Sequence, residues 1–428
     1  MDKPKQFFDV IISGGGLTGS LMALSLSQLT KVDGSLLSIA IVETQAYQKT
    51  TTTDAQALFD ERVLALSHGS ASYLNKIGAW QFIEKQACAI TDIDISDRGH
   101  FAKTRLTAAE HGVNALGYVV DMAIIGKAHL QALTANNNRG QNIHWFSPDS
   151  IEHIAWHNEL SAEFSEHKAS ASSQAQVKLK SGNVLSASLL LACDGVQSPC
   201  RELANIKVSA DDYAQVALIA NVSTSKAHQN KAFERFTNHG PIAMLPLNAI
   251  AANPNDSRCS LVWTMLPQDS EKMVALNDKD FAQALEEAFG RYLGQITHVG
   301  KRFSYPLVLL QAKQQVHHRM ALIGNASHTI HPIAGQGFNL GLRDVQVMAD
   351  IVSKALANNQ DIGSFALLNA YQSNRAKDQQ EIIQLTDSLV TLFANDLAPL
   401  VIGRNIGLHA LNFISPLKNA LVKKTMGY

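Results

Sequence analysis

The sequence predicts an α/β fold with three parts: a doubly wound α/β domain, a mostly antiparallel sheet domain interleaved with it, and a helical C-terminal region. A β-branched run at residues 7–13 leads through glycines into an apolar repeat of helical spacing. Residues 213–310 are rich in strand-like segments. From Phe365 onward the apolar spacing is mainly helical. Together these patterns favour one wound sheet and one antiparallel sheet over a single uniform body.

The first βαβ unit is the best defined of the expected elements. Phe7 to Ser13 is expected to form a strand, Leu17 to Leu29 a helix, and Leu37 to Val42 a second strand that ends at Glu43. This order is typical of a parallel sheet that binds its ligand beyond the carboxyl ends of the strands.

The later elements follow from the same patterns of spacing and turns. We expect a helix over Arg62 to Ile77, a strand at Ile93 to Ser96, a hairpin over Val177 to Leu191 that turns at Ser181 to Asn183, strands at Val216 to Val222, Ala243 to Pro246 and Ser260 to Met265, a helix near Asp280 to Tyr292, a strand at Met320 to Gly324 and a helix over Leu340 to Leu356.

These elements divide the chain into segments that belong alternately to two domains. The wound domain is expected to comprise 1–86, 121–206 and 312–360, the second domain 87–120 and 207–311, and the helical region 361–428.

The composition excludes several classes of protein. Hydrophobic residues make up 46% and charged residues 17% of the 428 residues, which is typical of a folded globular chain. Lys and Arg total 36 against 37 for Asp and Glu, so no global charge recruits nucleic acid. The four cysteines have no metal-ligand spacing, so we expect neither a metal site nor a disulfide framework. With no secretory or membrane-spanning pattern, we expect a cytoplasmic protein.

The run Gly14-Gly15-Gly16-Leu17-Thr18-Gly19 predicts a dinucleotide site. Gly14, Gly16 and Gly19 permit a tight turn, close approach of the backbone to a pyrophosphate, and close packing of the helix. Glu43 ends the next strand, where its carboxylate can accept a hydrogen bond from a ribose hydroxyl. The alternative is a glycine turn that serves packing alone.

Two later segments place short polar groups at the ends of other strands. One is Cys193 to Ser198, which contains Asp194-Gly195, and the other is Gly324 to His328, which contains Gly324-Asn325. Together with the glycine run, these segments resemble the three fingerprints of the FAD-dependent aromatic hydroxylases related to p-hydroxybenzoate hydroxylase. The resemblance implies a Rossmann-like FAD-binding domain, a substrate domain, FAD as cofactor and NADPH or NADH as cosubstrate.

The resemblance also implies which residues contact the cofactor. The first segment would hold the ADP half of FAD, the Asp-Gly segment would line the path shared by flavin and nicotinamide, and the third segment would meet the ribityl chain. The implied cofactor-binding residues are Gly14, Gly16, Gly19, Glu43, Arg62, Asp194, Gly195, Gly324, Asn325, Pro332, Gly335, Gly337 and Asn339. The family usually has Asp at the position of Asn325, and a neutral amide loses the charge assistance of a carboxylate.

Further segments narrow the resemblance to the 2-polyprenyl-6-methoxyphenol hydroxylase family of ubiquinone biosynthesis. They are 96–100, Ala232 to Thr237, 240–246, 300–302, Asn325 to Asp344 and 403–408. The resemblance implies hydroxylation of 2-polyprenyl-6-methoxyphenol to the 1,4-benzoquinol with O2 and NAD(P)H. The alternatives are hydroxylation at another ring position of a quinone precursor, a flavin reductase or oxidase, or a non-enzymatic FAD-bound subunit of an assembly. Other ubiquinone-biosynthesis proteins are possible partners.

No catalytic side chain is assigned, because the flavin carries the oxygen chemistry in such enzymes. His328 and His331 flank the glycine-containing loop and could bind a phenol or relay a proton, or they could serve structure alone. Arg235 could contact a nicotinamide phosphate or pair within its own sheet. Tyr305 could pack in the core or contact substrate.

A polyprenyl substrate calls for an apolar channel or a docking patch. The C-terminal region offers apolar residues for a peripheral contact with the inner face of a membrane or with a partner, and the same residues could pack against the wound domain. They are Leu385, Leu389, Leu392, Phe393, 397–402 and 406–417.

Overall fold

The structure is a computed structural model, and it describes most of the chain. The described residues are 5–46, 62–98, 103–135, 142–156, 174–237, 240–249, 257–331, 335–393, 422–424 and 426–427. Within them the strands form one sheet of eight strands, one of nine and one of three.

The eight-stranded sheet is the wound sheet that the sequence predicts. Its main path runs β18-β19-β11-β1-β2-β8, and its central pairs are parallel. The bounds are β1 Gln6–Ser13, β2 Ile39–Val42, β8 Ile143–Phe146, β9 Ile151–Trp156, β10 Ala175–Leu179, β11 Val184–Ala192, β18 Val316–His317 and β19 Met320–Leu322. The predicted hairpin is confirmed as β10 and β11, with Gly182 at φ +84° in its turn.

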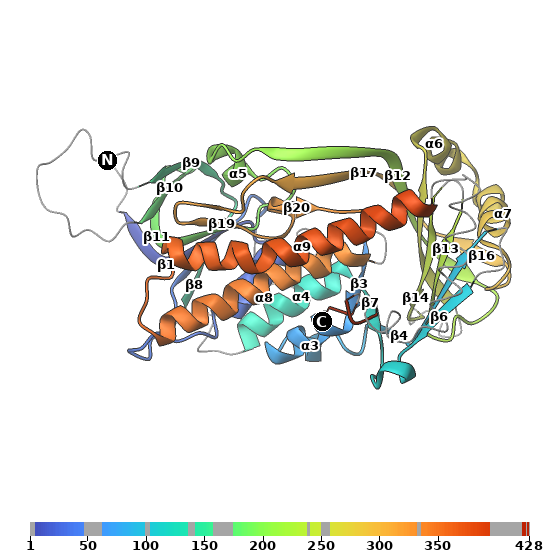
Figure 1. Ribbon diagram of the computed structural model, residues 1–428, viewed down its shortest axis with the longest axis horizontal. Helices are drawn as coiled ribbons and strands as arrows, with labels where there is room; N and C mark the ends of the chain where they lie inside the picture. Colours follow the sequence, from blue (N-terminus) through green and yellow to red (C-terminus); the bar gives the residue numbers. More distant parts are fainter. Residues whose placement is uncertain are drawn as a thin grey trace, which may run out of the picture.

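Helices cover one face of this sheet, as Figure 1 shows for α4, α8 and α9. Their apolar side chains share one core cluster with those of α1 and of the sheet. The bounds are α1 Leu17–Leu26, α3 His68–Lys76, α4 Met122–Ala135, α8 Gln336–Ala357 and α9 Phe365–Phe393. On the other face, Cys200 of the short α5 (Pro199–Leu203) and residues just after it join a second cluster.

The nine-stranded sheet is mostly antiparallel, as predicted, and runs β20-β17-β12-β15-β14-β13-β5-β6, with β16 paired to β12. The bounds are β5 Asp92–Asp97, β6 Lys103–Thr107, β12 Val208–Thr224, β13 Lys231–Phe236, β14 Ile242–Leu247, β15 Ser257–Met265, β16 Ile296–Val299, β17 Phe303–Ala312 and β20 His328–Thr329. Helices α6 (Pro267–Ala275) and α7 (Asp278–Phe289) lie on its outer side (Figure 1). The expected helix near 280–292 is therefore confirmed, whereas α6 was not predicted.

Two long strands join the bodies. β12 and β17 pair from Val208 opposite Ala312 to Ile219 opposite Phe303. At the end nearer the wound sheet, β17 also pairs with β20. Figure 1 shows both strands running from the wound sheet to the far sheet. The domain boundaries expected from the sequence remain predictions.

The expected helix over Arg62 to Ile77 is wrong in its first half. Val63–Ser67 forms β3, which pairs with β7 (Gly117–Asp121), and β7 also pairs with β4 (Cys88–Ile90). Only then does α3 begin, with the Ser67 hydroxyl accepting a hydrogen bond from the Ser70 N–H as its cap. The apolar residues before Ser67 suit either period, and pairing with β7 decides for a strand.

The helix expected at Leu340 begins earlier, at Gln336, with Gly335 as its N-cap. Residues 336–339, which the sequence suggested were a loop, form its first turn. Asn339 stabilises this turn, because its amide donates to the Gly335 carbonyl oxygen and also binds the backbone of β3, as described below.

A buried ionic network ties α8 and α9 to the end of β19. Asp344 is fully buried, and its carboxylate accepts hydrogen bonds from the Gly324 N–H (2.9 Å), Arg375 Nε (2.6 Å) and Gln379 Nε2 (3.0 Å). Arg375 also pairs with Asp378, whose other oxygen pairs with Arg343. Because a buried charge is tolerated only when it is paired, this network fixes the helices to the turn at Gly324.

Replacing Asp344 by Ala should lower the free energy of unfolding by about 3–5 kcal/mol, because Arg375 would be left buried beside an empty site. Urea unfolding measures this change. Asp350→Ala on the same helix is the matched control, since Asp350 faces Lys76 at 3.8 Å on the exposed side and should cost only about 0–1 kcal/mol. Equal effects of the two substitutions would contradict the role given to the network.

Candidate functional site

The carboxyl ends of four parallel strands meet at one edge of the wound sheet. β1, β2, β11 and β19 end at Ser13, Val42, Ala192 and Leu322. The residues that follow them are those singled out in the sequence, and the structure brings them together at the place where ligands bind in such sheets.

The glycine run makes the tight turn expected of it. Gly14 adopts φ +91°, and a Cβ there would lie 2.6 Å from the carbonyl oxygen of Cys193. A Cβ on Gly19 would lie 1.9 Å from the Gly14 oxygen, so α1 packs directly against the turn. At Gly16, by contrast, a Cβ would meet no atom of the described residues within 4 Å. Gly14 and Gly19 therefore serve packing, whereas Gly16 borders open space.

Glu43 holds the glycine run in place. Its side chain is 8% exposed, Oε2 accepts a hydrogen bond from the Gly15 N–H at 2.6 Å, and Oε1 accepts one from the Gln45 N–H at 2.8 Å. A carboxylate can accept further hydrogen bonds, so these contacts leave it able to receive a ribose hydroxyl.

Asp194 presents a carboxylate oxygen to the site. Its Oδ2 accepts hydrogen bonds from the Cys200 N–H (3.1 Å) and the Ser13 hydroxyl (3.3 Å). Its Oδ1 is buried and has no hydrogen-bond partner within the described residues. The next residue, Gly195, has φ +83° and would have no neighbour around a Cβ. A buried acceptor without a partner is costly, so this oxygen fits a bound hydroxyl or N–H group.

The segment after β19 is held by a hydrogen bond to its backbone at Gly324, whereas the side chain of Asn325 is exposed. Gly324 has φ +61°, and its carbonyl oxygen lies 2.9 Å from Nδ1 of His328, which must carry the hydrogen because a carbonyl only accepts. Burial lowers the pKa of His328. Asn325 is exposed, so its amide is accessible to a ligand.

Asn339 uses its amide within the protein. Oδ1 accepts hydrogen bonds from the Ser67 N–H (2.9 Å) and the Ser70 hydroxyl (2.7 Å), and Nδ2 donates to the carbonyl oxygens of Ala65 (2.8 Å) and Gly335 (2.7 Å). The side chain thus joins the start of α8 to the β3–α3 junction.

The start of α8 resembles the start of α1 in one respect. Gly335 has φ +62°, and neither Gly335 nor Gly16 supplies a side-chain cap, so both helices point open N-termini at the site. A Cβ on Gly337 would meet only Ile330, at 4.0 Å. Pro332, another predicted cofactor contact, lies outside the described residues.

Arg62 and His331 lie where the two bodies meet. The Arg62 guanidinium carbon lies 5.1 Å from the centre of the Tyr305 ring on β17. His331 packs edge-on against Tyr213 of β12 at 5.2 Å between ring centres, and burial lowers its pKa to about 4. His331 is therefore a neutral imidazole at neutral pH. Tyr213 in turn donates a hydrogen bond to Asp387 of α9.

The site suits a dinucleotide with a pyrophosphate. Open space at Gly16, an uncapped N-terminus of α1 and the unpartnered Oδ1 of Asp194 are what an anionic ligand bearing ribose and ribityl hydroxyls requires. The residues present thus fit FAD.

The inner face of the nine-stranded sheet turns toward β3, because Tyr305 on that face lies against Arg62, the residue before β3. Asn339 ties β3 in turn to the start of α8. One row of side chains crosses the inner face in register, and every member is half-buried: Ile95, Glu234, Ala243, Val262, Ile219 and Phe303. We call these six residues the inner row. The opposite face packs against α7 through Phe281 and Leu285 and against α6 through Met273. Next to the inner row, Ala232 and Leu245 pack against Val63 of β3.

Glu234 is the one charged residue of the inner row. Its carboxylate has no hydrogen bond or ion pair to any described side chain or backbone group, and burial raises its pKa to about 7. Its neighbour Arg235 points the other way, where Nη1 donates to the Tyr292 hydroxyl at 3.2 Å. Of the two roles open to Arg235, the structure shows a contact within its own domain.

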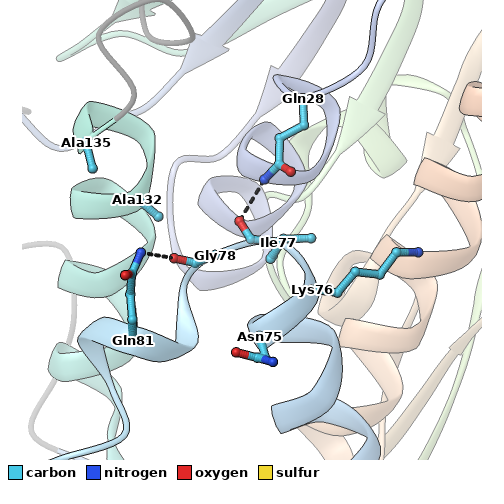
Figure 2. A pocket seen from close by; sticks show the side chains of 8 residues that line it. All are labelled: Gln28, Asn75, Lys76, Ile77, Gly78, Gln81, Ala132 and Ala135. Carbon is cyan, nitrogen blue, oxygen red and sulfur yellow. Dashed lines mark hydrogen bonds between the residues drawn. The ribbon is translucent and has the colours of Figure 1, made fainter.

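A surface hollow of about 280 Å³ lies elsewhere. Figure 2 shows its lining, in which Gln28 and Gln81 donate hydrogen bonds to the carbonyl oxygens of Ile77 and Gly78. Gln28 follows the C-terminal end of α1, whereas the glycine run precedes its N-terminus. The hollow is therefore separate from the site at the strand ends.

Comparison with known proteins identifies the family. A model of the FAD binding domain matches residues 152–386. The ubiquinone hydroxylase UbiL of Rhodospirillum rubrum is 32% identical over 98% of this chain and 89% of its own length. The chain belongs to the FAD-dependent monooxygenases of ubiquinone biosynthesis. It is thus a flavoprotein monooxygenase with FAD as cofactor and a hydroxylase role in ubiquinone synthesis.

Other relatives of this family cover the chain equally well. The 3-demethoxyubiquinol 3-hydroxylase of Escherichia coli is 30% identical over 98% of both chains. The mitochondrial ubiquinone biosynthesis monooxygenase COQ6 of Rattus norvegicus is 28% identical over 97% of this chain and 90% of its own.

Solved structures share the fold. The probable FAD-dependent monooxygenase PqsL of Pseudomonas aeruginosa aligns with a TM-score of 0.71 at 18% identity, over 95% of this chain and all of its own. The p-nitrophenol 4-monooxygenase PnpA of Pseudomonas putida has the same TM-score at 16% identity, over 99% of both chains.

Two residues near the site were missed in the sequence. Asp344 supports Gly324, and Glu234 lies on the inner face of the second sheet. A carboxylate on an apolar helix face is a signal for the first. The segment Lys231 to Phe236 carries no such signal for the second, because its polar and apolar residues do not alternate.

No helix in the described part of the chain is both long enough and apolar enough to span a bilayer. The same residues contain no group of three or more His, Cys, Asp or Glu side chains placed to hold a metal ion. Most of the apolar C-terminal residues, including 397–402 and 406–417, lie outside the described residues.

Gly16→Ala and Gly19→Ala should separate cofactor contact from packing. Gly19→Ala should lower the free energy of unfolding by about 1–3 kcal/mol, because its Cβ overlaps the turn. Gly16→Ala should leave stability unchanged in the FAD-free protein but weaken FAD binding, since its Cβ enters the open space. Unfolding curves of the FAD-free variants and FAD titrations test both. Normal FAD affinity in Gly16→Ala would contradict this assignment.

The raised pKa of Glu234 predicts a pH-dependent loss of stability. Between pH 4.5 and about 7 the folded chain keeps a proton that the unfolded chain releases, so the free energy of unfolding falls as pH rises through this window. Glu234→Gln removes this proton binding. The melting temperature of the variant minus that of the wild type should therefore increase from pH 4.5 to 7.5. The exposed Glu271→Gln is the control. A difference that does not vary with pH would show that Glu234 titrates normally.

Proposed function

We propose that the chain hydroxylates 2-polyprenyl-6-methoxyphenol to 2-polyprenyl-6-methoxy-1,4-benzoquinol, using O2 and NAD(P)H. The observation that carries the proposal is the inner row: an apolar stripe with one acidic group, on the face of the sheet turned toward β3 and so toward the start of α8. Such a surface suits an aromatic ring with a hydroxyl group and an apolar tail. The names of the relatives, ubiquinone hydroxylase and ubiquinone biosynthesis monooxygenase, support this class of substrate.

We assign the FAD contacts by position. The N-terminus of α1 with Gly16 would bind the pyrophosphate, Glu43 the adenosine ribose, and Asp194 Oδ1 a hydroxyl of the cofactor. Gly195, Gly324 and Asn325 would border the ribityl chain, and Gly335 and Gly337 would let α8 present N–H groups to the flavin ring.

Three predicted contacts take a supporting place in this assignment. Gly14 and Gly19 shape the turn, and Asn339 fixes the start of α8 because its amide is fully used by the protein. Arg62, stacked on Tyr305, would stand between flavin and substrate. His328 and His331 are buried, and we assign both to structural roles: His328 binds the Gly324 carbonyl oxygen, and His331 packs against Tyr213.

The chemistry that FAD supplies when bound is two-electron reduction by a nicotinamide and activation of O2, with one oxygen atom entering the ring and the other leaving as water. The chain's own residues would orient the ring and exclude water. The half-buried apolar side chains of the inner row serve both tasks.

A second candidate is hydroxylation at another position of the ring. The Escherichia coli relative is named a 3-demethoxyubiquinol 3-hydroxylase, and it covers this chain as fully as the others do. Because either substrate carries an apolar tail, we also propose that the protein makes a peripheral contact with the membrane.

Turnover with isotopically labelled O2 and a short-chain prenylated methoxyphenol tests the proposal. One labelled oxygen atom should enter each product molecule, and NMR of the product should place it opposite the original hydroxyl. Gly16→Ala, short of FAD, is the control. Oxidation of NAD(P)H without labelled product would contradict the proposal in favour of a reductase or oxidase, and label at another position would favour the second candidate.

A further inference from the structure

Glu234 is an unusual residue to find where it lies. Strand β13 places it on the inner face of the sheet, between Ile95 of β5 and Ala243 of β14. Beyond Ala243 the inner row continues with Val262 and Ile219. A carboxylate in such surroundings loses hydration, and natural chains offset this loss by pairing the charge or binding it with hydrogen bonds.

No such compensation exists among the described residues. The acidic and basic side chains around Glu234 have partners of their own: Arg235 donates to Tyr292, and Asp94 pairs with Arg105 and Lys231 on the outer face. Arg62 stacks on Tyr305, across the sheet from β13. The carboxylate is thus left to face the space between the sheets.

The backbone around Glu234 is held firmly. Just beyond β13, the Thr237 hydroxyl donates to the Gly240 carbonyl oxygen at 2.7 Å. Gly240 adopts φ +131°, and a Cβ there would lie 2.6 Å from the Thr264 carbonyl oxygen. The β13–β14 connection therefore packs tightly against β15, and the backbone that carries Glu234 is held in a fixed position.

We propose that Glu234 is a catalytic residue that accepts the phenol proton of the substrate. This inference rests on the proposed function and deepens it. The O–H bond of the phenol breaks, its proton binds the Glu234 carboxylate, and the electron pair stays on the phenolate oxygen. The ring gains electron density and becomes a better acceptor of the oxygen atom, while the apolar members of the inner row hold the tail.

The acidity of Glu234 suits this task. A free phenol has a pKa of about 10, and a carboxyl at its ordinary pKa would be a poor match for it. Burial raises the pKa of Glu234 to about 7, which brings it closer to the phenol and near to the working pH.

The test compares Glu234→Gln with wild type as FAD-loaded enzymes on two substrates. The first is a short-chain prenylated methoxyphenol, and the second is a fluorinated analogue that is already a phenolate at the assay pH. For the first, the variant should hydroxylate roughly a hundredfold more slowly, as is typical on loss of a general base. For the second, the rate should stay within a few-fold of wild type, because no proton has to be removed.

Controls separate this role from packing. Glu234→Asp keeps a carboxylate and should retain more activity on the first substrate than Glu234→Gln does, and the exposed Glu271→Gln should behave as wild type. Equal losses on both substrates, or an unchanged rate on the first, would overturn the inference. Wild-type enzyme that hydroxylates neither substrate would overturn the proposed function, and the role of Glu234 with it.

Discussion

The structure depends most on one buried carboxylate. Asp344 of α8 receives the Gly324 N–H with one oxygen and Arg375 and Gln379 of α9 with the other. A single side chain thereby joins two long helices to the turn that ends β19. This turn contains Asn325 and lies beside the glycine run, since a Cβ on Gly324 would lie 3.2 Å from Thr18. The contacts of Asp344 therefore fix the shape of the candidate FAD site at the end of β19, although Asp344 itself is buried.

A second set of contacts fixes the other side of the site. The Asn339 amide binds both strand β3 and helix α3, so the start of α8 cannot move without them. Much of the packing near the site is done by groups that never need to touch a ligand. Among the described residues, an oxygen of Asp194, the exposed Asn325 and the carboxylate of Glu234 are left without a hydrogen-bond partner. This division between supporting and free groups is typical of preorganised sites.

Local sequence patterns were sufficient to predict much of the fold and of the candidate site. The βαβ start, the β10–β11 hairpin and the strands of the second sheet follow from spacing and turn residues, and the motif residues do meet at one edge. The failures have physical causes. Val63 to Leu66 suits a helix or a strand, and only β7, far along the chain, decides between them. Glu234 and Asp344 gain their meaning from partners, or from the lack of them, on other elements, which spacing in one segment does not record.

The paired strands β12 and β17 carry a consequence for motion between the two sheets. A hinge between domains needs a connection that can bend, yet here two paired strands run from one sheet to the other. β12 and β17 pair from Val208 to Ile219, with one register shift between Asp212 and Gln215. The antiparallel sheet and the wound sheet are thus connected through the same pair of strands. These shared strands set the position of the antiparallel sheet relative to the wound sheet, so we expect little hinge motion between the two.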